Sequence, residues 1–244
     1  VTGVHVPPSA FLRAQIDACF GDFRIGAVKL GMLANSRVIN AVADALELHA
    51  PKHIVLDPVM VASSGACLLE PDALDALKRR LLPLASVVTP NIPEAELLLG
   101  HAIPDGDTAE AALVELLELG ASAVLLKGGH LPGRQLLDRL DDGWQLHEYE
   151  HPRLKVEGRG TGCTLASAIA ANLALGCAGA GLSAYALAYR TPKLPAPAAA
   201  SALAQQNLAS LYDVGVGLLI ASLLLFVGAF ANFGNLLALT RLEL

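Results

Sequence analysis

The clearest candidates for chemistry in this sequence are Gly160, Thr161, Gly162 and Cys163, because they open a run of small residues that predicts a helix. Glycines let the backbone approach an anion closely, and the free N–H groups and dipole at a helix start favour negative charge. The same field would stabilise a thiolate at Cys163. The segment therefore predicts a phosphate cradle with an acid–base or nucleophilic cysteine. The alternative is a tight turn that carries a buried cysteine.

Polar residues also follow three predicted strands. Asp57 comes at the end of an apolar run and is either a ligand-binding carboxylate or a solvated turn cap. Asn91 is expected to cap the helix after the next strand, and Glu94 suits the first-turn dipole or could reach a metal held near phosphate. Lys127 follows a third run and could meet a phosphate, whereas His130 is expected to be structural or solvent-facing.

The three strand ends and the glycine-rich loop would meet at one edge of a parallel sheet, where open α/β sheets place their ligands. Carboxylates, a lysine and a glycine-rich anion loop at one edge predict Mg²⁺-assisted phosphoryl transfer, with phosphates on backbone N–H groups and a positioned base. The sequence has no GxxxxGK[ST] motif, so this is not a Walker P-loop.

The elements that would position these residues alternate along the chain. Apolar runs predict buried strands over 28–33, 53–59, 86–89 and 123–127. Periodic segments predict helices over 36–49, 72–82, 93–99 and 108–119, the last with Asp107 as N-cap and Glu110 three residues on. Segments 135–140 and 144–149 flank Asp142-Gly143 and predict a β-hairpin. Such alternation favours an α/β fold with a mostly parallel sheet and right-handed crossovers.

The composition excludes several classes of protein. The chain has 244 residues, 54% of them hydrophobic and 16% charged, with a formal net charge of −6. So apolar a chain is not disordered, and its scattered basic residues exclude a nucleic-acid binder that works by backbone electrostatics. Much of the apolarity lies near the end of the sequence, where 214–240 contain no Asp, Glu, Lys or Arg.

Several motifs together resemble the hydroxymethylpyrimidine/phosphomethylpyrimidine kinases of thiamine biosynthesis, members of the ribokinase-like superfamily. They are VTGVHVPPSAF, AVKLGML, VLDPVMVASSG, TPNIPEAELLLG, VLLKGGHL and GTGCTLASAIAANLALG, in the family's order over 1–189. The resemblance implies a three-layer α/β/α sandwich and a cytoplasmic homodimer. It also implies phosphorylation of 4-amino-5-hydroxymethyl-2-methylpyrimidine and then of its monophosphate, with ATP and Mg²⁺. Hydroxyethylthiazole and pyridoxal kinases share the glycine loop and remain alternatives.

The resemblance also implies roles for individual residues. Cys163 takes the place of the catalytic base, and Gly160, Thr161 and Gly162 would supply the anion hole for the transferred phosphoryl group. Lys127 would lie near the nucleotide phosphates, and Asn91 belongs to a motif that serves them.

Four further positions match the family's metal and substrate sites. Asp57 and Glu94 correspond to the acidic positions around Mg²⁺ and the phosphates. Met32 and Val59 correspond to apolar positions that line the pyrimidine pocket, although each taken alone could be plain core.

The resemblance does not extend to the whole chain. We expect a kinase domain over 1–190 that lacks the family's N-terminal glycine-rich segment, an Ala/Pro-rich linker and helix over 191–213, and an apolar helical tail over 214–240. At about 1.5 Å per residue the tail could cross a membrane core of about 30 Å. The tail is therefore interpreted as a membrane anchor, a packed helix or an end altered by a frameshift. A catalytically inactive domain tethered to a membrane is the alternative to an active kinase.

Overall fold

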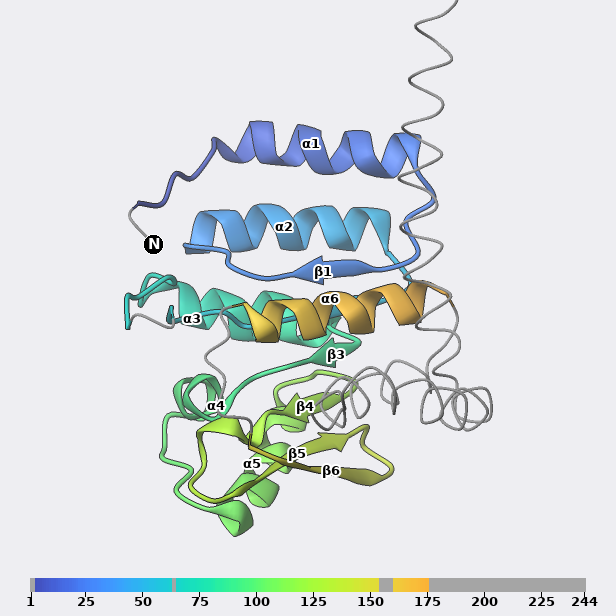
Figure 1. The fold of residues 1–244 in the computed structure, drawn as a ribbon. Coiled ribbons are helices and arrows are strands. Elements are labelled where there is room, and N and C mark those ends of the chain that lie inside the picture. Colours follow the sequence, from blue (N-terminus) through green and yellow to red (C-terminus); the bar gives the residue numbers. More distant parts are fainter. Residues whose placement is uncertain (1–2, 63–64, 154–159, 176–244) are drawn as a thin grey trace, which may run out of the picture. The chain divides into compact units, whose positions relative to one another are not determined.

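The computed structural model describes residues 3–62, 65–153 and 160–175, and within them the chain forms one six-stranded sheet (Figure 1). Its strands lie side by side in sequence order: β1 (Val28–Leu30), β2 (Ile54–Leu56), β3 (Val87–Val88), β4 (Val124–Leu126), β5 (Gln135–Asp141) and β6 (Leu146–Pro152). The first four are parallel, and the last two are antiparallel to their neighbours. The parallel carboxyl ends therefore share one edge.

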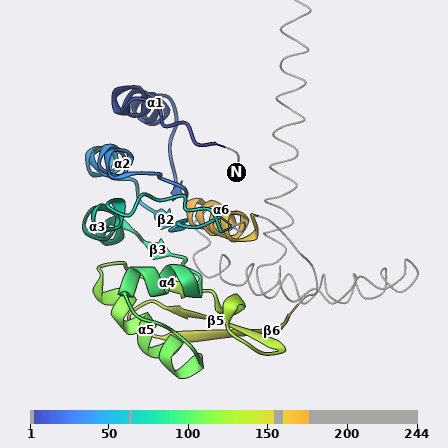
Figure 2. The ribbon, with the colours of Figure 1, turned by 90° about the vertical axis from the view of Figure 1, so that its left-hand side faces the viewer.

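Helices cover both faces of this sheet. Parallel strands in sequence order, joined by right-handed crossovers, place their connecting helices on the same face. Accordingly α2 (Ser36–His49), α3 (Ala73–Ala76) and α5 (Gly106–Glu118) lie on one face, and α6 (Thr161–Ala174) packs against β1 and β2 from the other (Figure 2). The predicted three-layer α/β/α fold is confirmed.

Helix α1 (Ser9–Asp22) was not predicted from the sequence, because it has no pronounced apolar face and buries no residue completely. It docks on α2 through a side-chain contact at one end. The Phe20 ring stacks on the His49 ring with centroids 4.4 Å apart, and His49 Nε2 lies 2.6 Å from Asp17 Oδ1. This position beyond β1 depends on a tertiary contact rather than on local periodicity.

The starts of two helices show how local sequence sets their bounds. Asn91 caps α4 (Ile92–Leu99) in a capping box with Glu94, as predicted for Asn91. The prediction that Asp107 caps α5 is wrong, since Asp105 holds that position in extended backbone and its Oδ1 accepts from Thr108 N at 2.9 Å. The third helical position is Thr108, whose side chain completes the capping box with Asp105. The sequence analysis looked only for a glutamate at that position.

Two other predicted elements are altered in detail. The predicted helix over 72–82 is an α-helical turn that continues as a π-helical turn, Leu77–Leu81, and a 3₁₀ turn, Leu82–Leu84. The predicted hairpin is present, and at its tip Asp142 Oδ1 accepts from the N–H groups of Trp144 and Gln145. Gly143 there has a φ of 80°, which favours glycine.

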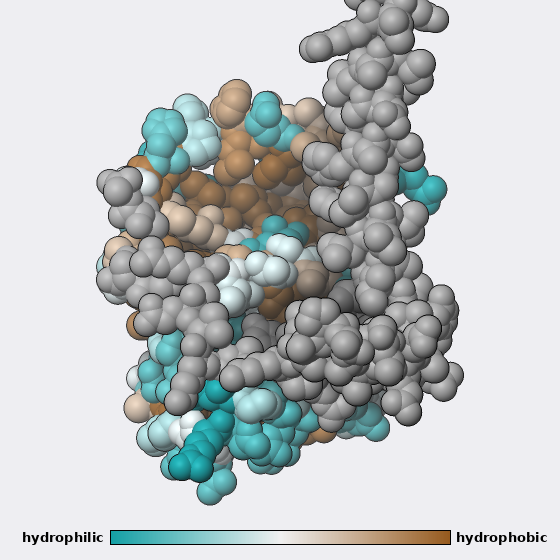
Figure 3. Space-filling view, viewed as in Figure 1, coloured by the Kyte–Doolittle hydropathy of each residue, from teal (hydrophilic) through white to brown (hydrophobic). Residues whose placement is uncertain are grey.

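Apolar residues fill the space between the sheet and the helices, and some remain at the surface. Apolar side chains also gather on the face of the molecule between α1 and α6 (Figure 3). Phe11 and Phe23 are 58% and 67% exposed. Among the described residues no helix combines the length and the apolarity that a membrane crossing requires. The predicted segments 191–213 and 214–240 and the boundary at 190 lie outside the described residues.

The turn after β4 packs so closely against β5 that it leaves no room for a side chain. A Cβ atom at Gly128 would overlap the carbonyl oxygen of Leu137, whereas a Cβ at Gly129 would meet no atom within 4 Å. Neither glycine has a positive φ, so the difference between them is one of space.

Gly128→Ala is therefore expected to destabilise the fold by about 1–3 kcal/mol, the usual cost of overpacking against backbone. Gly129→Ala is the matched control and should lie within about 0.5 kcal/mol of the parent, because nothing is displaced. Urea unfolding followed by circular dichroism measures both. Equal stabilities for the two variants would show that the turn does not pack on β5 in this way.

Candidate functional site

Asp57 is the centre of the candidate site. It follows β2 directly, and the residue is only 1% exposed. Thr89, at the end of the neighbouring strand, donates its hydroxyl to Asp57 Oδ1 at 3.4 Å. A carboxylate buried this deeply is costly unless charged partners and hydrogen bonds compensate it. The sequence placed Asp57 at this edge correctly, and its alternative as a solvated turn cap is excluded by the burial.

Two lysines supply the compensating charge. Lys127 Nζ lies 3.3 Å from Asp57 Oδ1, and Lys29 Nζ lies 3.5 Å from Asp57 Oδ2. Lys127 comes directly after β4, and its N–H donates to Pro90 O at 2.9 Å, which ties this strand end to the start of α4. Lys29 is within β1, the strand next to β2 in the sheet. Together with the Thr89 hydroxyl after β3, these contacts link the carboxylate at the end of β2 to the other three parallel strands.

Two glycines provide the space that these ammonium groups occupy. A Cβ at Gly31 would lie 2.7 Å from Lys29 Nζ, and one at Gly162 would lie 3.0 Å from Lys127 Nζ and 4.0 Å from Asp57 Oδ1. Gly162 is in the first turn of α6, and Gly160 before that helix has a φ of 76°. The glycine-rich start of α6 therefore lies directly against the lysine–aspartate group, as the sequence predicted for Lys127, Gly160 and Gly162.

Cys163 also belongs to this group, but its electrostatics differ from the prediction. Cys163 is an exposed residue, yet partial desolvation of its thiol raises the pKa above the ordinary value, and the interaction with Asp57 raises it further. Lys29 and Lys127 lower the same pKa without offsetting these effects. The expectation that the thiolate is stabilised at this helix start is therefore wrong, because desolvation first, and then Asp57, raise the thiol pKa more than the two lysines lower it.

Glu94 stands beside the lysines in the first turn of α4. Its Oε2 accepts from Asn91 N at 2.9 Å and lies 4.0 Å from Lys127 Nζ. Burial raises the pKa of Glu94, although Lys127 and the Asn91 N–H both lower it. Its carboxyl group thus completes the capping box of α4 while remaining close to Lys127.

The same residues decide how a magnesium ion could be held. Within the described residues no three His, Cys, Asp or Glu side chains are grouped around a possible metal position. Asp57 already has both oxygens on lysines, whereas no hydrogen bond between described residues uses Glu94 Oε1. Mg²⁺ often takes only one or two protein carboxylates and fills its other positions with phosphate and water. The donor set fits magnesium in that form and does not fit an all-protein cage.

The remaining predicted residues lie at the same sheet edge, outside the charged group. Met32 follows β1 by two residues and is 40% exposed. Val59 is half-buried, and its N–H donates to Asp57 O at 2.8 Å, so the turn after β2 is tight. Thr161 is the exposed first residue of α6.

Sequence reasoning missed Lys29 and Thr89. Lys29 is the one charged residue in the strand Val28–Leu30, and a lone lysine in an otherwise apolar strand was a signal that could have found it. Thr89 ends a strand next to the Pro-Asn pair and had no such distinguishing feature.

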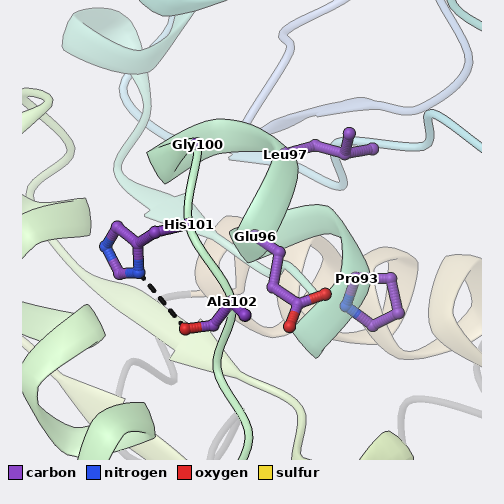
Figure 4. Close-up of a pocket in the computed structure, with 6 residues that line it drawn as sticks. All are labelled: Pro93, Glu96, Leu97, Gly100, His101 and Ala102. Carbon is purple, nitrogen blue, oxygen red and sulfur yellow. Dashed lines mark hydrogen bonds between the residues drawn. The ribbon is translucent and has the colours of Figure 1, made fainter.

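A shallow hollow of about 580 Å³ lies elsewhere, along the C-terminal half of α4, and is lined by Pro93, Glu96, Leu97, Gly100, His101 and Ala102 (Figure 4). Its polar groups already have structural partners. Glu96 Oε1 accepts from Ile103 N at 2.7 Å, and His101 Nε2 lies 3.0 Å from Glu115 Oε2. None of the predicted catalytic residues lines it.

Comparison with known proteins assigns this arrangement to a family. The profile of the phosphomethylpyrimidine kinase family matches residues 1–181. The chain belongs to this kinase family. Among curated members, the hydroxymethylpyrimidine/phosphomethylpyrimidine kinase of Rhizobium meliloti is 48% identical over 179 residues, which cover 72% of this chain and 66% of that protein. The thiamine biosynthesis bifunctional protein of Geobacter sulfurreducens is 48% identical over 177 residues, 72% of this chain and 36% of that protein.

Solved structures of the kinase family and its neighbours agree with the fold. The phosphomethylpyrimidine kinase of Clostridium difficile superposes with a TM-score of 0.64 at 38% identity, over 74% of this chain and 76% of that one. An ADP complex of Bacillus subtilis pyridoxal kinase gives a TM-score of 0.68 at 31% identity, over 74% and 71% of the two chains. The chain thus spans just under two thirds of its single-function curated relative and about a third of the bifunctional one.

The electrostatics of Cys163 give a direct test of this site. Asp57→Asn removes the charge that raises the thiol pKa and leaves the two lysines that lower it. The midpoint of Cys163 alkylation by iodoacetamide should therefore move to lower pH in the variant. Peptide mass spectrometry over a pH series separates Cys163 from Cys19 and Cys67, which serve as internal controls. An unchanged midpoint, or a shift to higher pH, would contradict the assigned Asp57–Cys163 interaction.

Proposed function

We propose that this protein transfers the terminal phosphoryl group of ATP to 4-amino-5-hydroxymethyl-2-methylpyrimidine and then to its monophosphate. The observation that carries the proposal is the placement of Gly162 against Lys127 and Asp57, in a chain that belongs to the phosphomethylpyrimidine kinase family. A glycine-rich helix start beside two ammonium groups is a site for phosphate oxygens. Phosphoryl transfer needs chiefly such positioning and charge stabilisation.

Each residue of the site has a separate role in the proposed phosphoryl transfer. Lys127 and the first-turn N–H groups of α6 bind phosphate oxygens, and Lys29 balances Asp57 so that the group is not left with an unpaired buried anion. The thiolate form of Cys163 accepts the proton of the substrate hydroxyl as that hydroxyl attacks the terminal phosphoryl group of ATP, and ADP leaves. The raised pKa of Cys163 makes the thiolate scarce at neutral pH and correspondingly more basic. Met32 and Val59 would border the pyrimidine ring at the same edge.

Glu94 would hold magnesium through Oε1 together with phosphate oxygens of the nucleotide, and Asp57 would join it in place of one of its two lysine contacts. The ion would supply neutralisation of phosphate charge. Asn91 supports this arrangement, because its side chain accepts from Glu94 N at 2.9 Å and fixes the turn that carries the carboxylate.

We also propose a cytoplasmic homodimer, by the same family resemblance. Light scattering of the purified chain tests its oligomeric state.

A pyridoxal kinase is the second candidate, because solved pyridoxal kinases superpose as well as the phosphomethylpyrimidine kinase does. The names of the curated relatives favour the pyrimidine alcohol. A hydroxyethylthiazole kinase and a catalytically inactive domain are further outcomes of the test.

The test is ATP consumption with the pyrimidine alcohol, pyridoxal and hydroxyethylthiazole, with the phosphorylated product identified by mass spectrometry. We expect the highest kcat/KM on the pyrimidine and a second phosphorylation of its monophosphate. Preference for pyridoxal or the thiazole would contradict the proposed substrate, and no turnover on any alcohol would contradict the kinase activity itself.

Cys163→Ala should lower kcat by about 100-fold, the usual contribution of a general base, with little change in the KM for ATP. Cys19→Ala is the matched control, since Cys19 is an exposed cysteine on α1, far along the chain from the site. A Cys163→Ala enzyme that works at the full rate would remove Cys163 from the mechanism.

A further inference from the structure

The turn Gly128–His130 directly follows Lys127, so its backbone sets where that lysine begins. Gly128 is buried against β5, and its N–H donates to Asp138 Oδ1 at 2.5 Å. Leu131 N donates back to Gly128 O at 3.0 Å and closes the turn. The position of the turn is therefore set by contacts with the hairpin rather than by its own short sequence.

Asp138 is a buried residue whose contacts serve this turn. It is 4% exposed, and its second oxygen, Oδ2, lies 3.0 Å from Nε2 of His151, which is also 4% exposed. The two oxygens thus join β6 to the turn through β5. Burial raises the pKa of Asp138, which shows how strongly its surroundings disfavour charge. The sequence analysis assigned no role to either residue.

Arg153 holds the same turn from the outside. Its guanidinium donates to three backbone oxygens: Nη1 to Gly129 O at 2.7 Å, Nη2 to Leu131 O at 2.6 Å and Nε to Gly133 O at 3.1 Å. Its own N–H donates to Arg134 O at 3.0 Å. These three donors sit on separate nitrogens of the guanidinium, whereas a lysine has a single ammonium nitrogen, so arginine and lysine are not interchangeable here. Such a concentration of bonds on one exposed side chain is unusual for a surface arginine.

We propose that Asp138 and Arg153 are positioning residues that place Lys127 for phosphate binding. Lys127 Nζ reaches Asp57 at 3.3 Å and Gly162 at the start of α6, so a shift of its backbone would move the ammonium away from both. Displacements of about 1 Å in positioning groups can cost up to about 100-fold in activity. This inference rests on the proposed function for its consequence, but not for the contacts themselves.

The first experiment measures the turn without any ligand. In Arg153→Ala, amide hydrogen exchange at Gly129, His130 and Leu131 should be at least about tenfold faster than in the parent protein. Arg134→Ala is the matched control, an exposed arginine of the same hairpin whose side chain forms no hydrogen bond or ion pair among the described residues. It should leave these rates unchanged. Unchanged exchange in Arg153→Ala would overturn the proposal.

The second experiment tests whether Arg153 acts through Lys127. Binding of ADP, measured by calorimetry, should weaken by about tenfold in Arg153→Ala and in Lys127→Ala, and the double variant should be no weaker than Lys127→Ala alone. Additive losses would overturn the proposal, because they would mean that Arg153 affects nucleotide independently of Lys127. A parent protein that binds no ADP would contradict the proposed function, and the exchange rates would then decide the positioning role alone.

Asp138 is tested by a conservative pair. Asparagine keeps an oxygen for the Gly128 N–H, so Asp138→Asn should retain ADP affinity within about twofold, whereas Asp138→Ala should lose about tenfold. In turnover assays the Ala variant should raise the KM for ATP more than it lowers kcat. Equal losses in both variants would overturn the role assigned to the Asp138–Gly128 hydrogen bond.

Discussion

The carboxylate of Asp57 lies almost completely out of contact with solvent, and the rest of the site follows from how its charge is balanced. A buried carboxylate must be paired and hydrogen-bonded, or it would protonate or destabilise the fold. Here Lys29, Lys127 and Thr89 meet it from β1, the end of β4 and the end of β3. Two lysines against one carboxylate leave an excess of one positive charge at this edge of the sheet, and the proposed phosphate binding rests on that excess.

The order of the sheet makes this possible. Because β1 to β4 are parallel and adjacent in sequence order, their carboxyl ends deliver side chains to a common edge without long excursions of the chain. Helix α6 then crosses the opposite face and brings its glycine-rich start to the same point. Glycine at Gly162 serves close approach rather than backbone conformation, since a Cβ there would lie 3.0 Å from Lys127 Nζ.

The residues that could be predicted were those whose local pattern matched their role. Asp57 and Lys127 ended apolar runs, and Asn91 preceded a helical segment with a glutamate three residues on, so strand and cap rules found them. The pKa of Cys163 could not be predicted in this way, because it depends on desolvation in the folded chain and on a carboxylate more than a hundred residues earlier in the sequence. Lys29 was missed for a related reason, since its partner lies on another strand.

The central claim is that Asp57 and Lys127 stabilise each other as a buried pair. A double-mutant cycle on the free energy of unfolding, with Asp57→Asn, Lys127→Met and the double variant, measures this coupling directly by urea titration. We expect a favourable coupling energy of about 1–3 kcal/mol, so that the double variant is more stable than the sum of the two single losses implies. Additive losses in the cycle would contradict it.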